Sequence, residues 1–105
     1  MASIEVINLL KKYVALLNSE GISVHRAYLY GSYSTDSASD SSDIDVLIVS
    51  ANQEDPDDRI TGKAWKLTRN INSKIEPLII GQNKFDNDTN SPLLSLIKSK
   101  GISII

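Results

Sequence analysis

The sequence predicts an α/β (α+β) domain in which a small mixed β-sheet of three to four strands is flanked by helices. Apolar runs of strand length occur around residues 22–30, 43–50 and 73–80. Amphipathic helical patterns precede the first run and separate the second run from the third. Strands and helices that alternate in this way are typical of the fold class. The 105 residues show no internal boundary, so residues 1–105 are expected to form a single domain.

The first helix is expected over residues 3–19, where apolar side chains recur at helical spacing. Gly21 stands where a helix C-cap is expected, and residues 22–30 then lead into the first strand. The apolar stripe of the helix consists of Ile7, Leu10, Val14 and Leu17.

The second strand opens with two carboxylates. Asp43 and Asp45 stand at the head of the apolar run 46–49. Residues two apart in a strand point to the same side, about 7 Å apart along the chain. Like charges on one face of a half-buried strand repel each other and are costly to desolvate, and a divalent cation removes that cost. Hard oxygen ligands of this kind suit Mg²⁺.

Gly31 and Ser32 follow the first strand and are the candidate phosphate-binding residues. A helix that starts there would offer free N–H groups to a phosphate. Residues 32–43 have the composition of a low-complexity linker, but a short segment between two strands favours a Gly-Ser turn with a brief helix. Ser42 is a candidate for capping or orienting the start of the second strand. A phosphate cradle beside metal-binding aspartates is what phosphoryl or nucleotidyl chemistry requires.

A polar loop over residues 51–58 leads into a second helix that is expected to run to about Asn70. Asp57 and Asp58 are good N-capping residues, and they also complement the helix dipole. Trp65 lies near the apolar stripe of this helix and is interpreted as packing, with a base-stacking platform as the alternative. The stripe consists of Ile60, Ala64, Leu67 and Ile71.

The same helix carries a basic row formed by Arg59, Lys63 and Lys66 at positions i, i+4 and i+7. A solvated helix face explains such a row most simply, and contact with an acidic partner is the alternative.

The third strand is expected over residues 73–80. Pro77 cannot donate to a ladder, so this strand is predicted to lie at an edge or to be irregular. Glu76 is the one acid in this apolar run and shares a face with Leu78 and Ile80. Taken alone, Glu76 would be interpreted as a solvated edge residue.

The C-terminal part reads as a polar loop over residues 81–90, a helix and a final short strand over residues 102–105. Ser91 is the expected N-cap of this helix and Pro92 its first residue. Gly101 marks the end of the helix, after basic residues in its last turn.

Composition excludes several classes of protein. The absence of cysteine rules out disulfides and thiolate metal sites. No apolar run is long enough for a membrane span, and no leader-like pattern occurs at the start, so a cytoplasmic location is expected. A net charge of −2 makes direct nucleic-acid binding unexpected, because general nucleic-acid binders are usually basic.

The combination of motifs resembles a known family. Gly31-Ser32, ten residues and then Asp43-Ile44-Asp45, set between two strands, are similar to the signature of the DNA polymerase β-like nucleotidyltransferase superfamily. The chain is most similar to the small stand-alone minimal nucleotidyltransferases of prokaryotes. Glu76 matches the third acidic residue of that family.

The resemblance implies the nucleotidyltransferase fold and a division of roles among these residues. Asp43, Asp45 and Glu76 would be the catalytic residues and would hold two Mg²⁺ ions in the active complex. Gly31, Ser32 and Ser42 would lie at the nucleotide, which is expected to be ATP. The implied reaction moves AMP to an acceptor hydroxyl on a small helical HEPN-type toxin, so that the chain acts as an antitoxin.

Two departures from the family pattern keep other interpretations open. Family members commonly place a basic residue shortly after Gly-Ser, whereas this chain has Thr35 followed by Asp36. The chain also has no room for an acceptor-binding helical domain, which disfavours a small-molecule acceptor such as an aminoglycoside. The main alternative is a catalytically weak or inactive binding module that neutralises its partner by complex formation.

Overall fold

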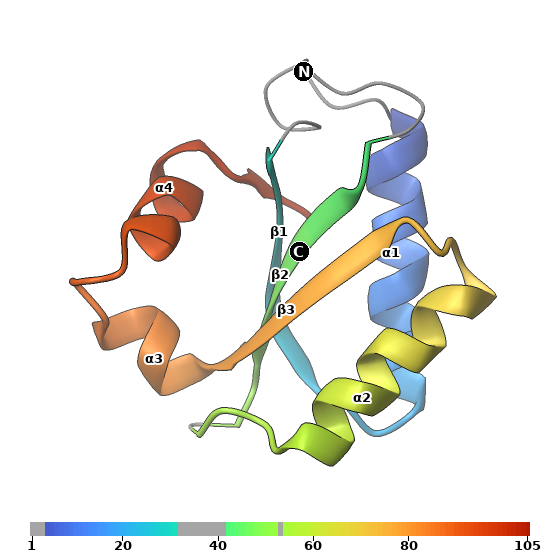
Figure 1. The fold of residues 1–105 in the computed structure, drawn as a ribbon, viewed down its shortest axis with the longest axis horizontal. Coiled ribbons are helices and arrows are strands. Elements are labelled where there is room, and N and C mark those ends of the chain that lie inside the picture. The colour runs from blue at the N-terminus through green and yellow to red at the C-terminus, as the bar shows by residue number, and fades with distance from the viewer. Residues whose placement is uncertain (1–3, 32–41, 53) are drawn as a thin grey trace.

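The computed structural model describes residues 4–31, 42–52 and 54–105, and its strands form one mixed sheet. The strands lie in the order β3-β2-β1-β4, with β2 central and antiparallel to β1 but parallel to β3 (Figure 1). This arrangement confirms the predicted fold class. The strands are β1 (Val24–Tyr30), β2 (Ile44–Ser50), β3 (Ile75–Gly81) and β4 (Ile102–Ser103).

Helices cover both faces of the sheet. The helices α1 (Ile4–Ser19) and α2 (Asp58–Leu67) lie on one side, and α3 (Gln82–Asn87) and α4 (Pro92–Lys100) lie on the other (Figure 1). A 3₁₀ turn over Thr68–Asn70 continues α2.

Both predicted N-caps are confirmed. The Asp57 carboxylate accepts a hydrogen bond from the N–H of Ile60 at 3.0 Å, and the Ser91 hydroxyl accepts one from Leu94 at 3.2 Å. Each cap satisfies one of the N–H groups that the first turn of a helix leaves without a partner.

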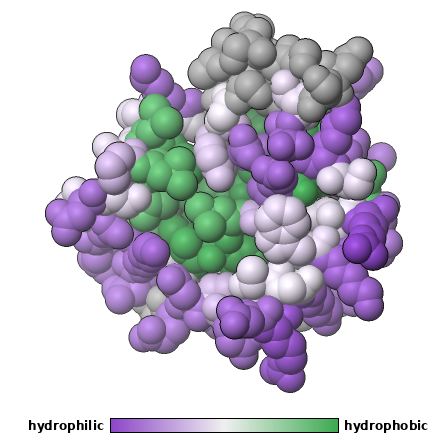
Figure 2. Space-filling view, in the orientation of Figure 1, coloured by the Kyte–Doolittle hydropathy of each residue, from purple (hydrophilic) through white to green (hydrophobic). Residues whose placement is uncertain are grey.

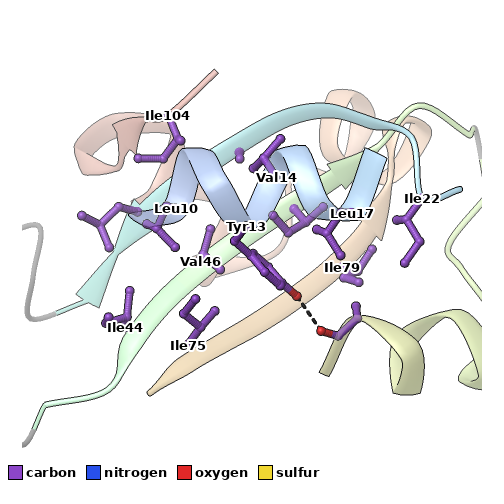
Figure 3. Close-up of a cluster of buried hydrophobic side chains, with 14 residues drawn as sticks. Leu10, Tyr13, Val14, Leu17, Ile22, Ile44, Val46, Ile75, Ile79 and Ile104 are labelled. Atoms are coloured by element: carbon purple, nitrogen blue, oxygen red, sulfur yellow. Dashed lines mark hydrogen bonds between the residues drawn. The ribbon is translucent and has the colours of Figure 1, made fainter. Parts of the chain in front are cut away.

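The main core fills the space between the sheet and the helices α1 and α2 (Figure 3). The predicted α1 stripe is buried at Leu10, Val14 and Leu17, and Ile7 packs at its margin. The sheet contributes every second residue of β2 to this face, as strand geometry requires. These β2 residues are Ile44, Val46 and Ile48.

Tyr13 joins the two helices that cover this core. Its side chain is fully buried, and its hydroxyl donates a 2.7 Å hydrogen bond to the carbonyl of Ala64 in α2 (Figure 3). At this end of α2, the N–H of Thr68 bonds to the carbonyls of Trp65 and Lys66 as the helix tightens. The regular partner for the Ala64 carbonyl would be that N–H, and the Tyr13 hydroxyl supplies a donor in its place.

Replacing Tyr13 with phenylalanine should lower the free energy of unfolding by about 1–3 kcal/mol, because a buried carbonyl loses its donor. Urea denaturation followed by circular dichroism measures this change. Tyr28→Phe is the matched control, since no hydrogen bond of the Tyr28 hydroxyl is found in the described part of the chain. Equal midpoints for the two variants would show that the Tyr13 bond does not contribute.

A second, smaller core lies on the opposite face, under α3 and α4. Phe85 is only 8% exposed, and its ring stacks on that of Tyr28 with the centroids 5.5 Å apart. The ammonium of Lys98 lies 4.9 Å from the centre of the Phe85 ring. The prediction of a polar loop over residues 81–90 is therefore wrong for Gln82–Asn87, which form α3. One aromatic residue in a polar run anchors the short helix α3.

The edge position predicted from Pro77 is confirmed, because β3 is the outer strand of the sheet beside β2. An edge strand tolerates a residue without an N–H, since one of its sides has no ladder to supply.

The surface has two notable apolar features. Trp65 is 45% exposed, so its interpretation as a packing residue is wrong. Three leucines, Leu78, Leu93 and Leu96, are also exposed. Figure 2 shows a continuous hydrophobic area over the sheet and α4, whereas hydrophilic side chains cover the region of α2. Among the described helices, none has the length and apolar character that crossing a membrane requires.

Candidate functional site

The pairing of the strands places three side chains in one row across the sheet. Asp45 in β2 lies opposite Tyr30 in the antiparallel neighbour β1 and opposite Glu76 in the parallel neighbour β3. Residues in register on adjacent strands project from the same face. The face is the one that α3 and α4 cover only in part, because Leu47 and Val49 of β2 belong to the smaller core.

Asp43, Asp45 and Glu76 lie close enough together to influence one another electrostatically. Burial raises the pKa of the Glu76 carboxyl above its usual value, and the negative charges of the two aspartates raise it further. Ionised carboxylates this close to one another repel, so a bound proton or a bound cation would relieve the repulsion.

The pKa of Asp45, at the centre of the row, is raised in the same way. Burial raises its pKa, the charge of Asp43 adds to that effect, and interaction with the Glu76 side chain opposes it. The neighbouring Tyr30 hydroxyl also has a raised pKa, first because of burial and then because of Asp45 and Glu76. The protein alone therefore stabilises less negative charge than these groups carry when they are ionised.

Asp43 lies at the exposed end of the cluster, immediately before β2. The backbone at this point is fixed by a 2.8 Å hydrogen bond from the N–H of Ile44 to the carbonyl of Lys74. This bond joins the starts of the two parallel strands. It therefore holds the segment that carries Asp43 beside the segment that carries Glu76.

Gly31 follows Tyr30 and contacts the same carboxylate. Its φ of +76° lies in the left-handed region that glycine adopts without strain. A Cβ atom added at this position would overlap Oδ2 of Asp45 and lie 3.3 Å from its Cγ. The absence of a side chain at residue 31 thus makes room for Asp45, a steric reason for this glycine that the sequence did not reveal.

The predicted nucleotide-binding residues are only partly described. Gly31 lies at the acidic cluster, and Ser42 is half-buried beside Asp43. Ser32, Thr35 and Asp36 lie outside the described residues, as does the predicted brief helix after Gly31. The phosphate-binding roles of Gly31, Ser32 and Ser42 therefore stay predictions.

The chemistry of the donor set suits a hard divalent cation. Within residues 4–31, 42–52 and 54–105, no three His, Cys, Asp or Glu side chains form a ready-made site for one metal ion. Mg²⁺ is usually held by one or two carboxylates together with phosphate oxygens of a substrate, and not by an all-protein cage. Asp43 and Asp45 would supply the two carboxylates of that pattern, and a nucleotide would supply the phosphate oxygens.

The sequence also matches the model of a known protein family. Residues 6–104 match the model of the family described as Polymerase beta, Nucleotidyltransferase. The chain belongs to this nucleotidyltransferase family. The match covers nearly the whole chain, so the family domain and the described sheet with its helices coincide. The family resemblance inferred from Gly-Ser and Asp-Ile-Asp is confirmed. None of the curated proteins compared with the chain matches it in sequence.

Solved structures with the same fold include nucleotidyltransferases and toxin–antitoxin complexes. One is a putative nucleotidyltransferase from Sulfolobus solfataricus, which is 21% identical to this chain and has a TM-score of 0.61. The match covers 83% of this chain and 77% of that chain. Another is a toxin–antitoxin with AMP-PNP, which is 21% identical to this chain and has a TM-score of 0.65. The match covers 94% of this chain and 72% of that chain.

A third solved structure is a mutant of the toxin–antitoxin MntA–HpeT. It is 20% identical to this nucleotidyltransferase, with a TM-score of 0.62, and the match covers 90% of this chain and 70% of that chain. At this level of identity, the three structures support the fold.

Tyr30 is the member of the row that sequence reasoning missed. Its position, one residue before Gly31 at the end of a strand, was visible in the sequence. Its place opposite Asp45 follows from the strand register, which the sequence alone does not give.

Proposed function

We propose that this nucleotidyltransferase moves AMP from ATP, with Mg²⁺, to a hydroxyl of a protein partner. The observation that carries the proposal is the strand register, which sets Glu76 beside Asp45 on an incompletely covered face of the sheet, with Asp43 two residues before Asp45. Such a cluster is costly to an isolated fold and useful to an enzyme whose substrate brings cations and phosphates.

The proposed reaction is a single displacement at phosphorus. The acceptor oxygen forms a bond to the α-phosphorus of ATP while the bond from that atom to the bridging oxygen of the β-phosphate breaks. Pyrophosphate leaves, and the hydroxyl proton passes to a carboxylate of the cluster. When bound, Mg²⁺ would lower the pKa of the acceptor and neutralise the leaving charge.

The residues of this chain have distinct parts in the proposal. Asp43 and Asp45 would hold the cations that neutralise the triphosphate, and Glu76 would complete the site on the side of the acceptor. Gly31 lets the backbone approach the phosphates, while Ser32 and Ser42 offer hydroxyl donors. No covalent protein intermediate is required, so catalysis rests on positioning and charge stabilisation.

The proposed acceptor is a small helical HEPN-type toxin, which makes the chain an antitoxin of the cytoplasm. The similarity in fold to the two toxin–antitoxin structures supports this choice, and one of them contains AMP-PNP.

A second candidate function is neutralisation by binding alone. The sequence favours it at one point, because Thr35 and Asp36 stand where family members carry a basic residue near the triphosphate. The exposed leucines of β3 and α4 would serve a binding module equally well.

Transfer of label from α-³²P-ATP to a protein in a lysate of the source cells tests the proposal. We expect a labelled band with Mg²⁺ that is absent with γ-³²P-ATP and with the Asp43→Asn/Asp45→Asn double variant. If wild type and double variant are equally silent with all four nucleotides, enzymatic transfer is excluded under these conditions. If no transfer is seen but the protein is purified in a stable complex with a partner, that result would favour the binding module.

A further inference from the structure

A basic groove runs along α2 beside the end of α1, in the helical layer that covers the main core. Its volume is about 530 Å³, and its lining includes Arg59, Lys63, Lys66 and Arg69. These cations recur at positions i, i+4, i+7 and i+10, so they extend over about 15 Å of helix. Asp45 and Glu76 project from the opposite face of the sheet, so the groove is separate from the proposed catalytic site.

The charge of the groove contrasts with that of the whole chain. The groove gathers four of the 11 basic residues, although the net charge of the chain is −2. Among the residues that the structure describes, Glu20 is the only acid in the groove lining. The ammonium of Lys63 donates a 2.8 Å hydrogen bond to the Glu20 carbonyl and lies 3.9 Å from its carboxylate. The remaining three cations give the groove a local positive excess.

Trp65 adds an aromatic platform to this surface. It lines an adjoining hollow of about 440 Å³ that shares Gly62, Lys66 and Arg69 with the groove. Nearly half of its surface is exposed, although tryptophan is a residue that proteins usually bury to a large extent. A cationic track beside an exposed indole is the combination with which proteins hold single-stranded nucleic acid.

We propose that this groove binds a single-stranded polynucleotide, with phosphates on the cations and a base stacked on Trp65. An acidic protein segment would complement the charges but would not account for the exposed indole of Trp65. A polynucleotide uses both, since every nucleotide carries an anion and a flat ring. The expectation against nucleic-acid binding rested on net charge, which does not describe how charge is distributed.

The single tryptophan makes a direct measurement possible. Dodecamers of uridylate and of thymidylate, titrated into the full chain at low salt, should quench the Trp65 fluorescence with a Kd of about 10 µM. The logarithm of the association constant should fall against log[salt] with a slope of about −2, as expected when three phosphates are neutralised. Comparing the two dodecamers shows whether the sugar matters.

Variants locate the binding. With fluorescein-labelled dodecamers followed by anisotropy, Lys66→Glu should weaken binding at least 10-fold, and Trp65→Ala should weaken it about 10-fold. Lys11→Glu is the matched control, because it makes the same change of charge on an exposed part of α1 outside the groove lining. Lys66→Gln, a milder change, keeps the comparison valid if the charge reversal impairs folding.

Three results would overturn the proposal. One is the absence of quenching and of anisotropy change with either dodecamer. Another is equal weakening by Lys11→Glu and Lys66→Glu, which would indicate non-specific attraction. The third is binding of a polyglutamate peptide, but of neither dodecamer, at the same salt concentration, which would assign the groove to an acidic protein. None of these readouts depends on nucleotidyl transfer.

Discussion

Replacing Asp45 with asparagine should abolish nucleotidyl transfer while making the metal-free protein more stable. The loss of transfer should be on the order of 10³-fold, because the central carboxylate of the cluster is removed from the proposed catalytic site. Label transfer from α-³²P-ATP at saturating Mg²⁺ measures the activity. Urea denaturation in EDTA measures the free energy of unfolding.

The stability gain should depend on pH in a defined direction. Burial and the charge of Asp43 raise the pKa of Asp45 in the folded protein. The folded state therefore binds this proton more tightly than the unfolded state, where the pKa is about 3.9. As pH rises from about 4 through the folded pKa, ionisation of Asp45 lowers the stability of the wild type. Asparagine cannot ionise, so Asp45→Asn should exceed wild type in stability at pH 7 and equal it at pH 3.

Asp86→Asn is the matched control, since Asp86 is an exposed acid on α3. It should leave transfer unchanged, and it should not give the stability gain expected of Asp45→Asn. A second check is the addition of Mg²⁺ with ATP, which should stabilise wild type more than Asp45→Asn. A variant that is less stable than wild type at pH 7 in EDTA would contradict the electrostatic description of the site.

The second large effect is expected at Gly31. Alanine at this position would hold a left-handed backbone conformation, which costs an ordinary residue about 1–2 kcal/mol. Its Cβ would also overlap the Asp45 carboxylate, so either β1 or the Asp45 side chain must move. We expect Gly31→Ala to lose more than about 2 kcal/mol of unfolding free energy and at least 10-fold of transfer activity.

Gly21→Ala separates the effect of backbone strain from the effect of overlap with the Asp45 carboxylate. Gly21 has a φ of +90°, and among the described residues no atom lies within 4 Å of the position that its Cβ would take. This variant should lose about 1–2 kcal/mol through backbone strain and keep its transfer activity. Equal losses of activity in the two variants would show that contact with Asp45 is not what Gly31 provides.

Local patterns in the sequence were sufficient for most of the fold. The α1 stripe, the caps at Asp57 and Ser91 and the apolar runs each depend on neighbours within a few residues. The helix α3 was missed because its six residues hold a single aromatic side chain, and the helix depends on Tyr28 from a distant strand. Trp65 was misplaced for a related reason. Helical spacing alone does not say how wide the buried stripe of α2 is.

The candidate site was predicted by residue type but not by geometry. Asp43 and Asp45 are two residues apart, so their proximity follows from the strand itself. Glu76 lies 31 positions further along, and its place opposite Asp45 depends on the parallel register of β2 and β3. That register is set by the whole core, together with the bond between Ile44 and Lys74. Tyr30 enters the site through the other ladder of β2, again through a pairing that no local pattern contains.

The two edges of the sheet have a consequence for the behaviour of the chain in concentrated solution. An exposed strand edge is a template for a strand of another molecule and thus for fibrils. Here β3 carries Pro77, which has no N–H to offer, and β4 is only two residues long. Neither edge presents a long, unbroken row of backbone donors and acceptors. The protein can therefore expose apolar leucines on one face without its strands pairing between molecules.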